Sequence, residues 1–468
     1  MGRDVDIDEV LTKLRERCRA VSGEESRPTL ETVLEESARR GVLYGNAATL
    51  FEKWRLYMRY VGEAVPKALS LPADKATQFR QFVDGLIQLL DRAEEQAGEK
   101  LAKICKAVEE GRVEVIERSK AVSHICDGGV CIHTQLTRAP VFKLPLHDIS
   151  AKLYFPSIGL GPEEVEAFQL GWRASDETAD KRRPMMATTQ PWQLFAWSAT
   201  RPGWMRVHVV EVGINAGGLS LEIYAVAKDW TQKWSKEEAQ RMALEALRGG
   251  DYRPLLTWYL GDGVVDGRRE KIGLSTAVNI EMINGLLGGS YNYRKIELSR
   301  RRAKELAKKI TTSVGRYGVL LEVLYSHKWV YLKALVDYRP SFDPAYVVIK
   351  GVVMRLHLSA KTLHAVRYFA EREEAEKALN ALKPHAKMYV DRRWYVAYIP
   401  WRELKELLKR DPTLREAVAR YLAGRNKPVA KKLLSQIPLF DTNSVILMKI
   451  GWSPGRDLNL IPDPLAGA

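Results

Sequence analysis

An acidic residue bounded by glycines, Asp262 in the segment 255–263, is the strongest candidate for chemistry in this sequence. The apolar residues 255–260 before it are typical of a helix, and Gly263 allows the left-handed conformation that ends helices. Carbonyl groups at a helix C-terminus carry partial negative charge, so Asp262 and the Gly261 carbonyl together favour a hard cation such as Mg²⁺. The alternative interpretation is a solvated aspartate before a turn.

The elements around this aspartate have to position it. A helix is expected to begin near Asp251, whose side chain can cap the free amides of the first turn, and Pro254 is tolerated there because those amides lack intrahelical partners. Thr257 and Gly261 are small and four residues apart, so they share one face of the helix. That face permits close approach of a second helix, which would bring two acids near one axis.

The nonapeptide 255–263, Leu-Leu-Thr-Trp-Tyr-Leu-Gly-Asp-Gly, resembles the signature helix of the LAGLIDADG homing endonucleases, particularly the variants that end in Leu-Gly-Asp-Gly. The resemblance covers this motif and not the whole sequence. It implies that Asp262 is the catalytic and metal-binding acid, with Gly261 beside it at the metal. The residues that it assigns to the motif and its helix interface are Leu255, Thr257, Trp258, Gly261 and Gly263.

The resemblance also implies partners and a cofactor. Because the sequence offers one such acid per chain, two chains are expected to pair as a homodimer through the motif helix, with Mg²⁺ as cofactor if the domain cleaves DNA. Lys271 is the candidate catalytic lysine, with Arg268 and Arg269 as further basic candidates. An ordinary solvated turn explains these three residues equally well.

The charge distribution independently indicates a polyanionic partner. Residues 251–468 hold 38 Lys and Arg against 22 Asp and Glu, whereas residues 1–250 hold 35 against 36. Double-stranded DNA is the predicted partner, because phosphate contacts provide most non-specific affinity for nucleic acid. A membrane is not expected, since we find no apolar run of about 18 residues and no lipidation signal. The candidate DNA-contacting residues are Arg268, Arg269, Tyr291, Tyr293, Arg294, Lys295, Arg300, Arg301, Arg302 and Lys304.

Length and hydrophobic patterning predict an α+β protein with three domains. Residues 1–111 form a helical domain, in which Phe79, Phe82 and Leu86 recur at helical spacing. Residues 112–234 form a β-rich domain with strands at 205–210 and 221–226. Residues 235–468 form a basic, LAGLIDADG-like domain with an αββαββ saddle for DNA.

The third domain has well-marked elements. Ser235 and Glu238 form a capping box at the start of a helix that ends at residues 249–250. After the motif helix we expect a hairpin at 264–275, a helix at 299–312 and a hairpin at 319–332. Downstream, a strand at 346–358, a helix at 362–382, a hairpin at 388–399 and a helix at 401–409 indicate a degenerate second lobe without a motif helix of its own.

A nearly symmetric segment, residues 124–133, indicates a hairpin that turns at Gly128 and Gly129. Its register places Cys126 opposite Cys131 and His124 opposite His133. Zinc is unlikely here, because a flat hairpin presents its ligands in a row. A cross-strand disulfide and an ordinary hairpin are the alternatives. Four cysteines in 468 residues do not form a disulfide scaffold, and with no secretory signal they favour the cytoplasm.

Two functions therefore remain open, and the sequence does not decide whether the protein is an enzyme. One is a DNA-binding protein with a site-specific LAGLIDADG-type endonuclease domain. The other is a catalytically degraded protein that binds DNA without cleaving it. The overall arrangement, with a long N-terminal half before the Leu-Gly-Asp-Gly helix, also resembles the PaRep-type repeat-family proteins of crenarchaea, which have no assigned function. A basic surface for an acidic protein partner is a third interpretation.

Overall fold

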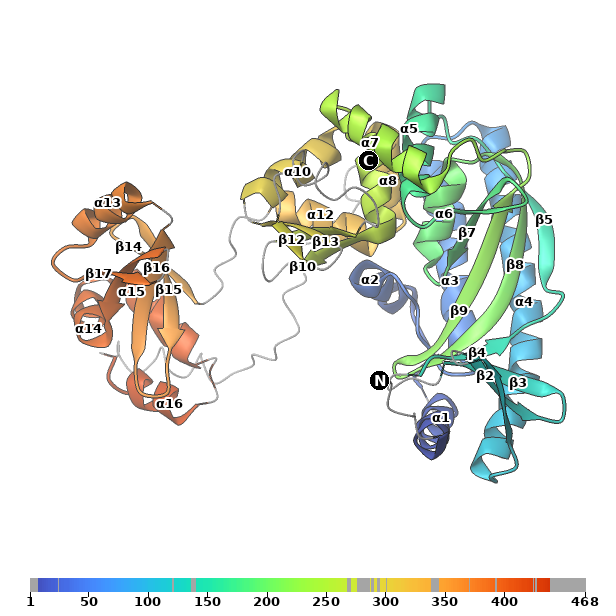
Figure 1. The fold of residues 1–468 in the computed structure, drawn as a ribbon, viewed down its shortest axis with the longest axis horizontal. Helices are drawn as coiled ribbons and strands as arrows, with labels where there is room; N and C mark the ends of the chain where they lie inside the picture. The colour runs from blue at the N-terminus through green and yellow to red at the C-terminus, as the bar shows by residue number, and fades with distance from the viewer. Residues whose placement is uncertain are drawn as a thin grey trace. The chain divides into compact units, whose positions relative to one another are not determined.

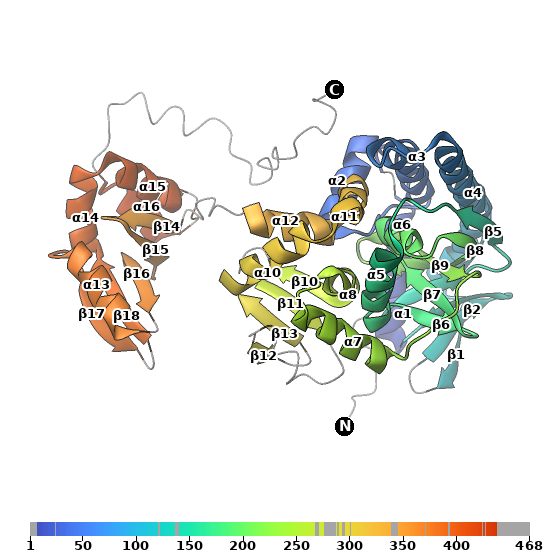
Figure 2. The same ribbon diagram turned by 90° about the horizontal axis from the view of Figure 1, so that it is seen from above.

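The chain forms two compact units, residues 1–337 (unit 1) and residues 338–468 (unit 2) (Figures 1 and 2). The computed structural model describes residues 7–23, 25–119, 122–135, 140–266, 271–275, 287, 290–292, 295–299, 301–337, 345–369, 371–391, 394–423, 425, 427 and 428–437. The predicted domain boundaries at residues 111 and 234 both fall inside unit 1. The helices before residue 111 pack directly on the sheet that follows them, so these segments share one core.

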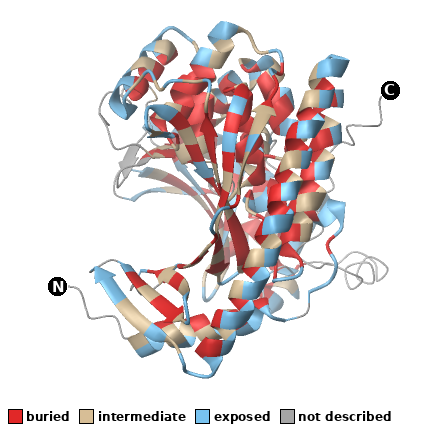
Figure 3. Cartoon of the chain, turned by 90° about the vertical axis from the view of Figure 1, so that its right-hand side faces the viewer, coloured by how far each residue is buried: buried red, intermediate tan, exposed pale blue. Residues whose placement is uncertain are grey.

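Four helices open unit 1, in the segment that the spacing of apolar residues predicted to be helical. They are α1 (Ile7–Val21), α2 (Leu30–Arg40), α3 (Leu50–Ala68) and α4 (Ala73–Glu109). Along α4, the side chains of Phe79, Phe82, Leu86 and Leu90 recur on one face and are almost fully buried. Figure 3 shows α4 with alternating buried and exposed positions along its length. The buried face lies against β3, β5 and β8 of the sheet.

An antiparallel sheet of nine strands covers the N-terminal helices. Its strands are β1 (Glu114–Ser119), β2 (Val122–Asp127), β3 (Val130–Thr134), β4 (Phe142–Pro145), β5 (Ser150–Phe155), β6 (Thr178–Asp180), β7 (Arg183–Thr188), β8 (Gly203–Asn215) and β9 (Gly218–Ala227). They follow the order β1-β2-β3-β4-β8-β9-β7-β6, and β5 also pairs with β8. Both strands predicted at 205–210 and 221–226 are confirmed, as parts of β8 and β9.

Unit 1 contains a structural repeat that the sequence did not reveal. The first repeat runs α5 (Pro162–Ala174), β6, β7, α6 (Pro191–Ala199), β8, β9 and α7 (Lys236–Arg248). The second repeat contains α8 (Arg253–Asp262), β10 (Gly263–Asp266), β11 (Lys271–Ser275), β12 (Ser290–Asn292), β13 (Lys295–Ser299) and α10 (Arg301–Thr312). If the strands of each repeat are numbered 1 to 4 along the chain, both have the spatial order 1-2-4-3. We predicted one set with two hairpins after residue 251, the second of them at 319–332. The structure instead forms this second hairpin from β12 and β13, and it also has a set before residue 251.

Several elements that we predicted between residues 235 and 332 are confirmed, and one is wrong. The capping box of Ser235 and Glu238 is present, as are the β10–β11 hairpin and the helix at 301–312. The hairpin predicted at 319–332 is wrong, because the segment forms α11 (Gly315–Val323) and α12 (His327–Asp337). Tyr317, Leu320, Leu321 and Leu324 recur at helical spacing and are fully buried, which outweighs the strand preference of the valines.

The hairpin of β2 and β3 has the predicted register, with Cys126 opposite Cys131 and His124 opposite His133. Cys126 and Cys131 form a disulfide, so neither thiolate is free to bind zinc, and this pairing excludes the four-ligand zinc hypothesis. The rings of His124 and His133 stack with their centroids 4.4 Å apart. A second disulfide joins Cys18 of α1 to Cys105 of α4, so all four cysteines are paired, against the expectation from composition.

Unit 2 is a five-stranded antiparallel sheet with helices on one face. Its elements are β14 (Tyr346–Ile349), β15 (Val352–Leu358), β16 (Leu363–Phe369), α13 (Arg372–Leu382), β17 (Lys387–Asp391), β18 (Trp394–Pro400), α14 (Trp401–Arg410), α15 (Pro412–Ala423) and α16 (Pro428–Leu434). The strand order is β14-β15-β16-β18-β17. The single strand predicted at 346–358 is a hairpin that turns at Lys350 and Gly351, both with positive φ. The first part of the helix predicted at 362–382 is strand β16, because Leu363 and Ala365 alternate towards the core.

A pair of glutamates on β8 and β9 makes the stability of unit 1 depend on pH. Burial and the neighbouring Glu222 raise the pKa of Glu211 to about 7, although Lys143 contacts both carboxylates. When the pKa of an acid is higher in the folded chain than in the unfolded chain, the folded chain loses stability as pH rises through the interval between these two pKa values. We therefore expect Glu211→Gln to increase the free energy of unfolding at pH 8 relative to the parent chain, and to change it less at pH 5.

Urea midpoints at the two pH values measure this effect. Glu117→Gln on β1 is the matched control, because Glu117 is exposed. An equal gain from Glu211→Gln at pH 5 and pH 8 would contradict the assigned pKa of Glu211.

Candidate functional site

The motif helix forms where the sequence predicted it, with one difference at its end. Helix α8 begins at Arg253, and the Asp251 carboxylate accepts a hydrogen bond from the Arg253 backbone amide at 3.0 Å. At the other end, Gly263 has φ −82° and continues as strand β10, so the predicted left-handed stop is wrong. Gly263 is required for space, since a Cβ there would lie 2.3 Å from the Tyr259 carbonyl oxygen.

A second helix of the same chain packs against the predicted interface of α8. Helices α5 and α8 lie side by side (Figures 1 and 2). Their backbones approach closely at Gly171, where an added Cβ would lie 1.9 Å from the Pro254 carbonyl oxygen and 2.1 Å from Thr257 Oγ1. The Thr257 hydroxyl donates a hydrogen bond to the Phe168 carbonyl at 2.8 Å. The face predicted for a homodimer is therefore already buried within the chain, which overturns that expectation.

The same packing continues one turn further along both helices. A Cβ added at Gly261 would lie 2.2 Å from Ser175 Oγ, so Gly261 and Ser175 are the second point of close approach. Gly171, Ser175 and Asp176 repeat the spacing of Thr257, Gly261 and Asp262. The expectation of one acid per chain is therefore wrong, because α5 and α8 each carry an acid at their ends.

The carboxyl groups of Asp176 and Asp262 lie within hydrogen-bonding distance of each other. The Asp262 side chain is partly buried, and burial followed by the charge of Asp176 raises its pKa. Asp176 also accepts a hydrogen bond of 2.8 Å from the side-chain amide of Gln193, at the start of α6. Two carboxyl groups this close repel each other when both are ionised, so a proton or a cation must lie near them.

Lys328 provides a cation at this place. It follows the first residue of α12, and its ammonium donates a hydrogen bond to the Gly261 carbonyl oxygen. Burial lowers the pKa of Lys328 to about 8, while the charges of Asp176 and Asp262 act in the opposite direction. The Tyr259 hydroxyl donates to the Lys328 carbonyl at 2.9 Å, which fixes the start of α12 against α8. Lys328 is thus positioned at the acid pair by elements that the sequence did not predict.

The residues at this site do not fit the Mg²⁺ that the resemblance implied. The Gly261 carbonyl, which was the expected second ligand, already accepts the ammonium of Lys328. A divalent cation on the same oxygen would be repelled by that ammonium.

The other predicted site residues lie elsewhere or outside the described part of the chain. In the backbone register of the β10–β11 hairpin, Lys271 lies opposite Asp266, which is three residues after Gly263. The Lys271 ammonium forms an ion pair of 3.0 Å with Glu297. The ammonium of Lys271 is thus paired with an acid of the neighbouring strand β13. Arg302 is exposed on α10 and Lys304 is partly exposed there. The residues outside the described structure, or whose side chains are not described, are Arg268, Arg269, Tyr291, Tyr293, Arg294, Lys295, Arg300 and Arg301.

The first repeat presents a basic surface that sequence analysis missed. Arg183 belongs to β7, Arg206 to β8, and Lys228 directly follows β9. The register of these strands, extended by alternation to Arg183 and Lys228, places the three side chains on one face. Lys152 of β5, opposite Arg206, extends the group. Burial first, and then the charges of Arg183 and Arg206, lower the pKa of Lys228. These residues belong to the half of the chain without net positive charge, so composition did not reveal them.

Comparison of the chain with known protein families, with curated proteins and with solved structures finds no match. Across the described residues, no helix is long and apolar enough to cross a lipid bilayer.

Proposed function

We propose that unit 1 binds double-stranded DNA through two LAGLIDADG-like repeats of a single chain, without cleaving it. The observation that carries the proposal is the pairing of α5 and α8, which joins two sheets of the same strand order and brings Asp176 and Asp262 together. Residues 255–263 resemble one LAGLIDADG signature helix, and the pairing with α5 gives the chain a second helix of the same kind. Because both repeats belong to one chain, the proposed DNA target does not need to be a palindrome.

The surface of the first repeat supports DNA as the partner. Arg183, Arg206, Lys228 and Lys152 share the face of the sheet that α4 does not cover, since neighbouring Leu153 points towards Gly85 of α4. Four cations on one sheet face suit the phosphates of a duplex. The proposed binding is mainly electrostatic, so its affinity should decrease as salt concentration increases.

Replacing Arg183 or Arg206 by alanine is expected to weaken binding to a mixed-sequence duplex. Each lost phosphate contact should reduce the slope of log affinity against log salt concentration by about 1. Fluorescence anisotropy between about 50 and 200 mM salt measures both quantities. Lys106→Ala on α4 removes the same charge from an exposed helical position and is the matched control. Equal losses in all three variants, or no salt-dependent binding, would contradict the proposal.

Endonuclease activity is the second candidate function, and the two acids at paired helix ends favour it. Lys328 favours the non-cleaving alternative, because its ammonium occupies the Gly261 carbonyl oxygen that would otherwise bind a metal ion. Incubation of the parent chain and of Asp262→Ala with a mixed duplex pool and Mg²⁺ separates the two. We expect neither protein to cut. Cleavage by the parent chain that Asp262→Ala loses would establish the endonuclease instead.

A further inference from the structure

One face of the sheet in unit 2 is not covered by any described helix of that unit. The other face packs against α13, α14 and α15 through Met354, Leu356, Ala365 and Ile399, which are fully buried. Strand pairing places His357, His364, Tyr398 and Tyr389 together on the uncovered face. Val366 and Val396 share this face, because Val366 is paired with Tyr398 and Val396 with Tyr389, and both valines are almost fully buried.

The four larger side chains form a continuous row of rings across β15, β16, β18 and β17. The centroids of His357 and His364 are 4.8 Å apart, those of His364 and Tyr398 are 5.0 Å apart, and those of Tyr398 and Tyr389 are 6.2 Å apart. We call these four residues the ring row. Tyr389 is 46 % exposed, and Tyr368 beside it is 50 % exposed. Exposed rings in a row on a sheet provide flat surfaces on which unpaired bases can stack.

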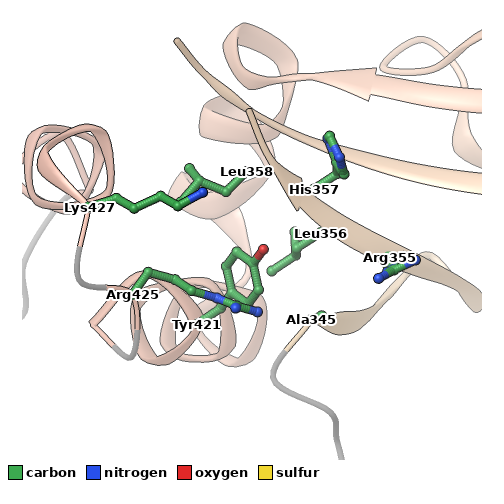
Figure 4. A pocket seen from close by; sticks show the side chains of 8 residues that line it. All are labelled: Ala345, Arg355, Leu356, His357, Leu358, Tyr421, Arg425 and Lys427. Carbon is green, nitrogen blue, oxygen red and sulfur yellow. The ribbon is translucent and has the colours of Figure 1, made fainter. Parts of the chain in front are cut away.

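A small cavity opens at the His357 end of the ring row. Its volume is about 210 Å³, and its cationic side chains are Arg355, Arg425 and Lys427, with His357 beside them. Figure 4 shows Arg425 and Lys427 reaching from the helical side towards β15, which carries Arg355 and His357. The guanidinium of Arg425 lies 4.7 Å from the ring centroid of Tyr421. None of the described residues that line this cavity is acidic. A cavity of this size and charge suits a phosphate group.

We propose that this face of unit 2 binds single-stranded DNA, with bases stacked on the ring row and a backbone phosphate in the adjoining cavity. The rings select unpaired bases, since the bases of a duplex are already stacked on each other. The net charge of residues 338–468 supports a polyanion, because they hold 23 Lys and Arg against 13 Asp and Glu. DNA is chosen over RNA because unit 1 is proposed to act on DNA.

This inference concerns a different unit and different residues from the proposed duplex site. The choice of DNA over RNA rests on the proposed function, whereas the stacking site itself does not. The two can therefore fail separately. Variants of the ring row should leave duplex binding by unit 1 unchanged, and Arg206→Ala should leave binding of single strands unchanged.

Binding of the full chain to a fluorescein-labelled oligothymidylate of 15 nucleotides tests the proposal by anisotropy. Removing one stacking ring is expected to weaken binding by about 5-fold to 100-fold. Tyr389→Ala and Tyr398→Ala should both show this loss, and Tyr398→Phe should keep most of the affinity because it keeps the ring. Tyr389 is half exposed, so Tyr389→Ala remains informative if Tyr398→Ala unfolds unit 2.

The phosphate cavity is tested with Arg425→Ala and Lys427→Ala, each of which should weaken binding of the same oligonucleotide. Lys377→Ala on α13 removes an equal charge from an exposed position on the opposite side of the sheet and should have little effect. Tighter binding of oligouridylate than of oligothymidylate would overturn the choice of DNA. The stacking site would be overturned if the Arg206→Ala chain bound a duplex and a single strand with equal affinity. It would also be overturned if neither Tyr389→Ala nor Tyr398→Ala weakened binding of the single strand.

Discussion

Gly171→Ala is expected to lower the free energy of unfolding of unit 1 by roughly 3 kcal/mol or more. The added methyl group would lie 1.9 Å from the Pro254 carbonyl oxygen and 2.1 Å from Thr257 Oγ1, both on the paired helix. Neither atom is the end of a flexible side chain, so α5 and α8 must move apart. Their separation would also disrupt Asp176, Asp262 and the orientation of the two repeats, and duplex binding should be lost with stability.

Gly98→Ala is the matched control for this prediction. Gly98 lies in the interior of α4, and an added Cβ there meets no atom within 4 Å. Alanine is favoured over glycine in a helix interior by about 0.5–1 kcal/mol, so this variant should be as stable as the parent chain or slightly more so. Urea denaturation followed by circular dichroism measures both variants. A Gly171→Ala chain as stable as Gly98→Ala would show that the two helices are not closely packed.

Lys328→Met is expected to destabilise unit 1 by about 3 kcal/mol, because it removes a mostly buried charge whose opposite charges stay in place. The variant leaves Asp176 and Asp262 close together without a cation and frees the Gly261 carbonyl. The parent chain should have the same melting temperature with Mg²⁺ and with a chelator. The Lys328→Met chain should become more stable as Mg²⁺ is added, since a bound ion stabilises the folded state that binds it.

Two further variants separate this effect from a general loss of charge. Lys333→Ala removes a lysine from the same helix, where its ion pair with Glu322 is largely exposed, and it should cost little. Adding Asp262→Asn to Lys328→Met removes one of the two acids and should restore part of the lost stability. A parent chain that Mg²⁺ stabilises as strongly as the variant would show that Lys328 does not occupy the place of a cation.

The contrast between α8 and α5 explains why half of the candidate site was found from the sequence. The segment 255–263 has a continuous apolar run that ends in Gly-Asp-Gly, which is a local signal. In α5, Gln169 and Arg173 interrupt the apolar run, and Glu177 stands where α8 has Gly263. The two helices share only a pair of small residues four positions apart followed by an acid. This pattern is a weaker signal than the apolar run that ends in Gly-Asp-Gly. Aligning that spacing along the chain would have pointed to Asp176.

Lys328 could not have been found in the same way. Its residue type and neighbours predicted a turn between two strands, and its role depends on α12 lying against the end of α8. The segments 315–337 and 363–369 were misassigned for a related reason. Short apolar runs suit a helix or a strand equally well, and burial within the finished core decides between them.

The sequence by itself determined the elements with strong local signals: the four N-terminal helices, the capped helix α7, the motif helix α8 and the hairpin of β2 and β3. These depend on spacing, caps and turn residues that lie close together along the chain. Only the tertiary structure decided that α5 is the partner of α8, that Asp176 joins Asp262, and that Lys328 lies beside them. Those contacts join residues 66 to 152 positions apart, and packing and charge in a shared core select them.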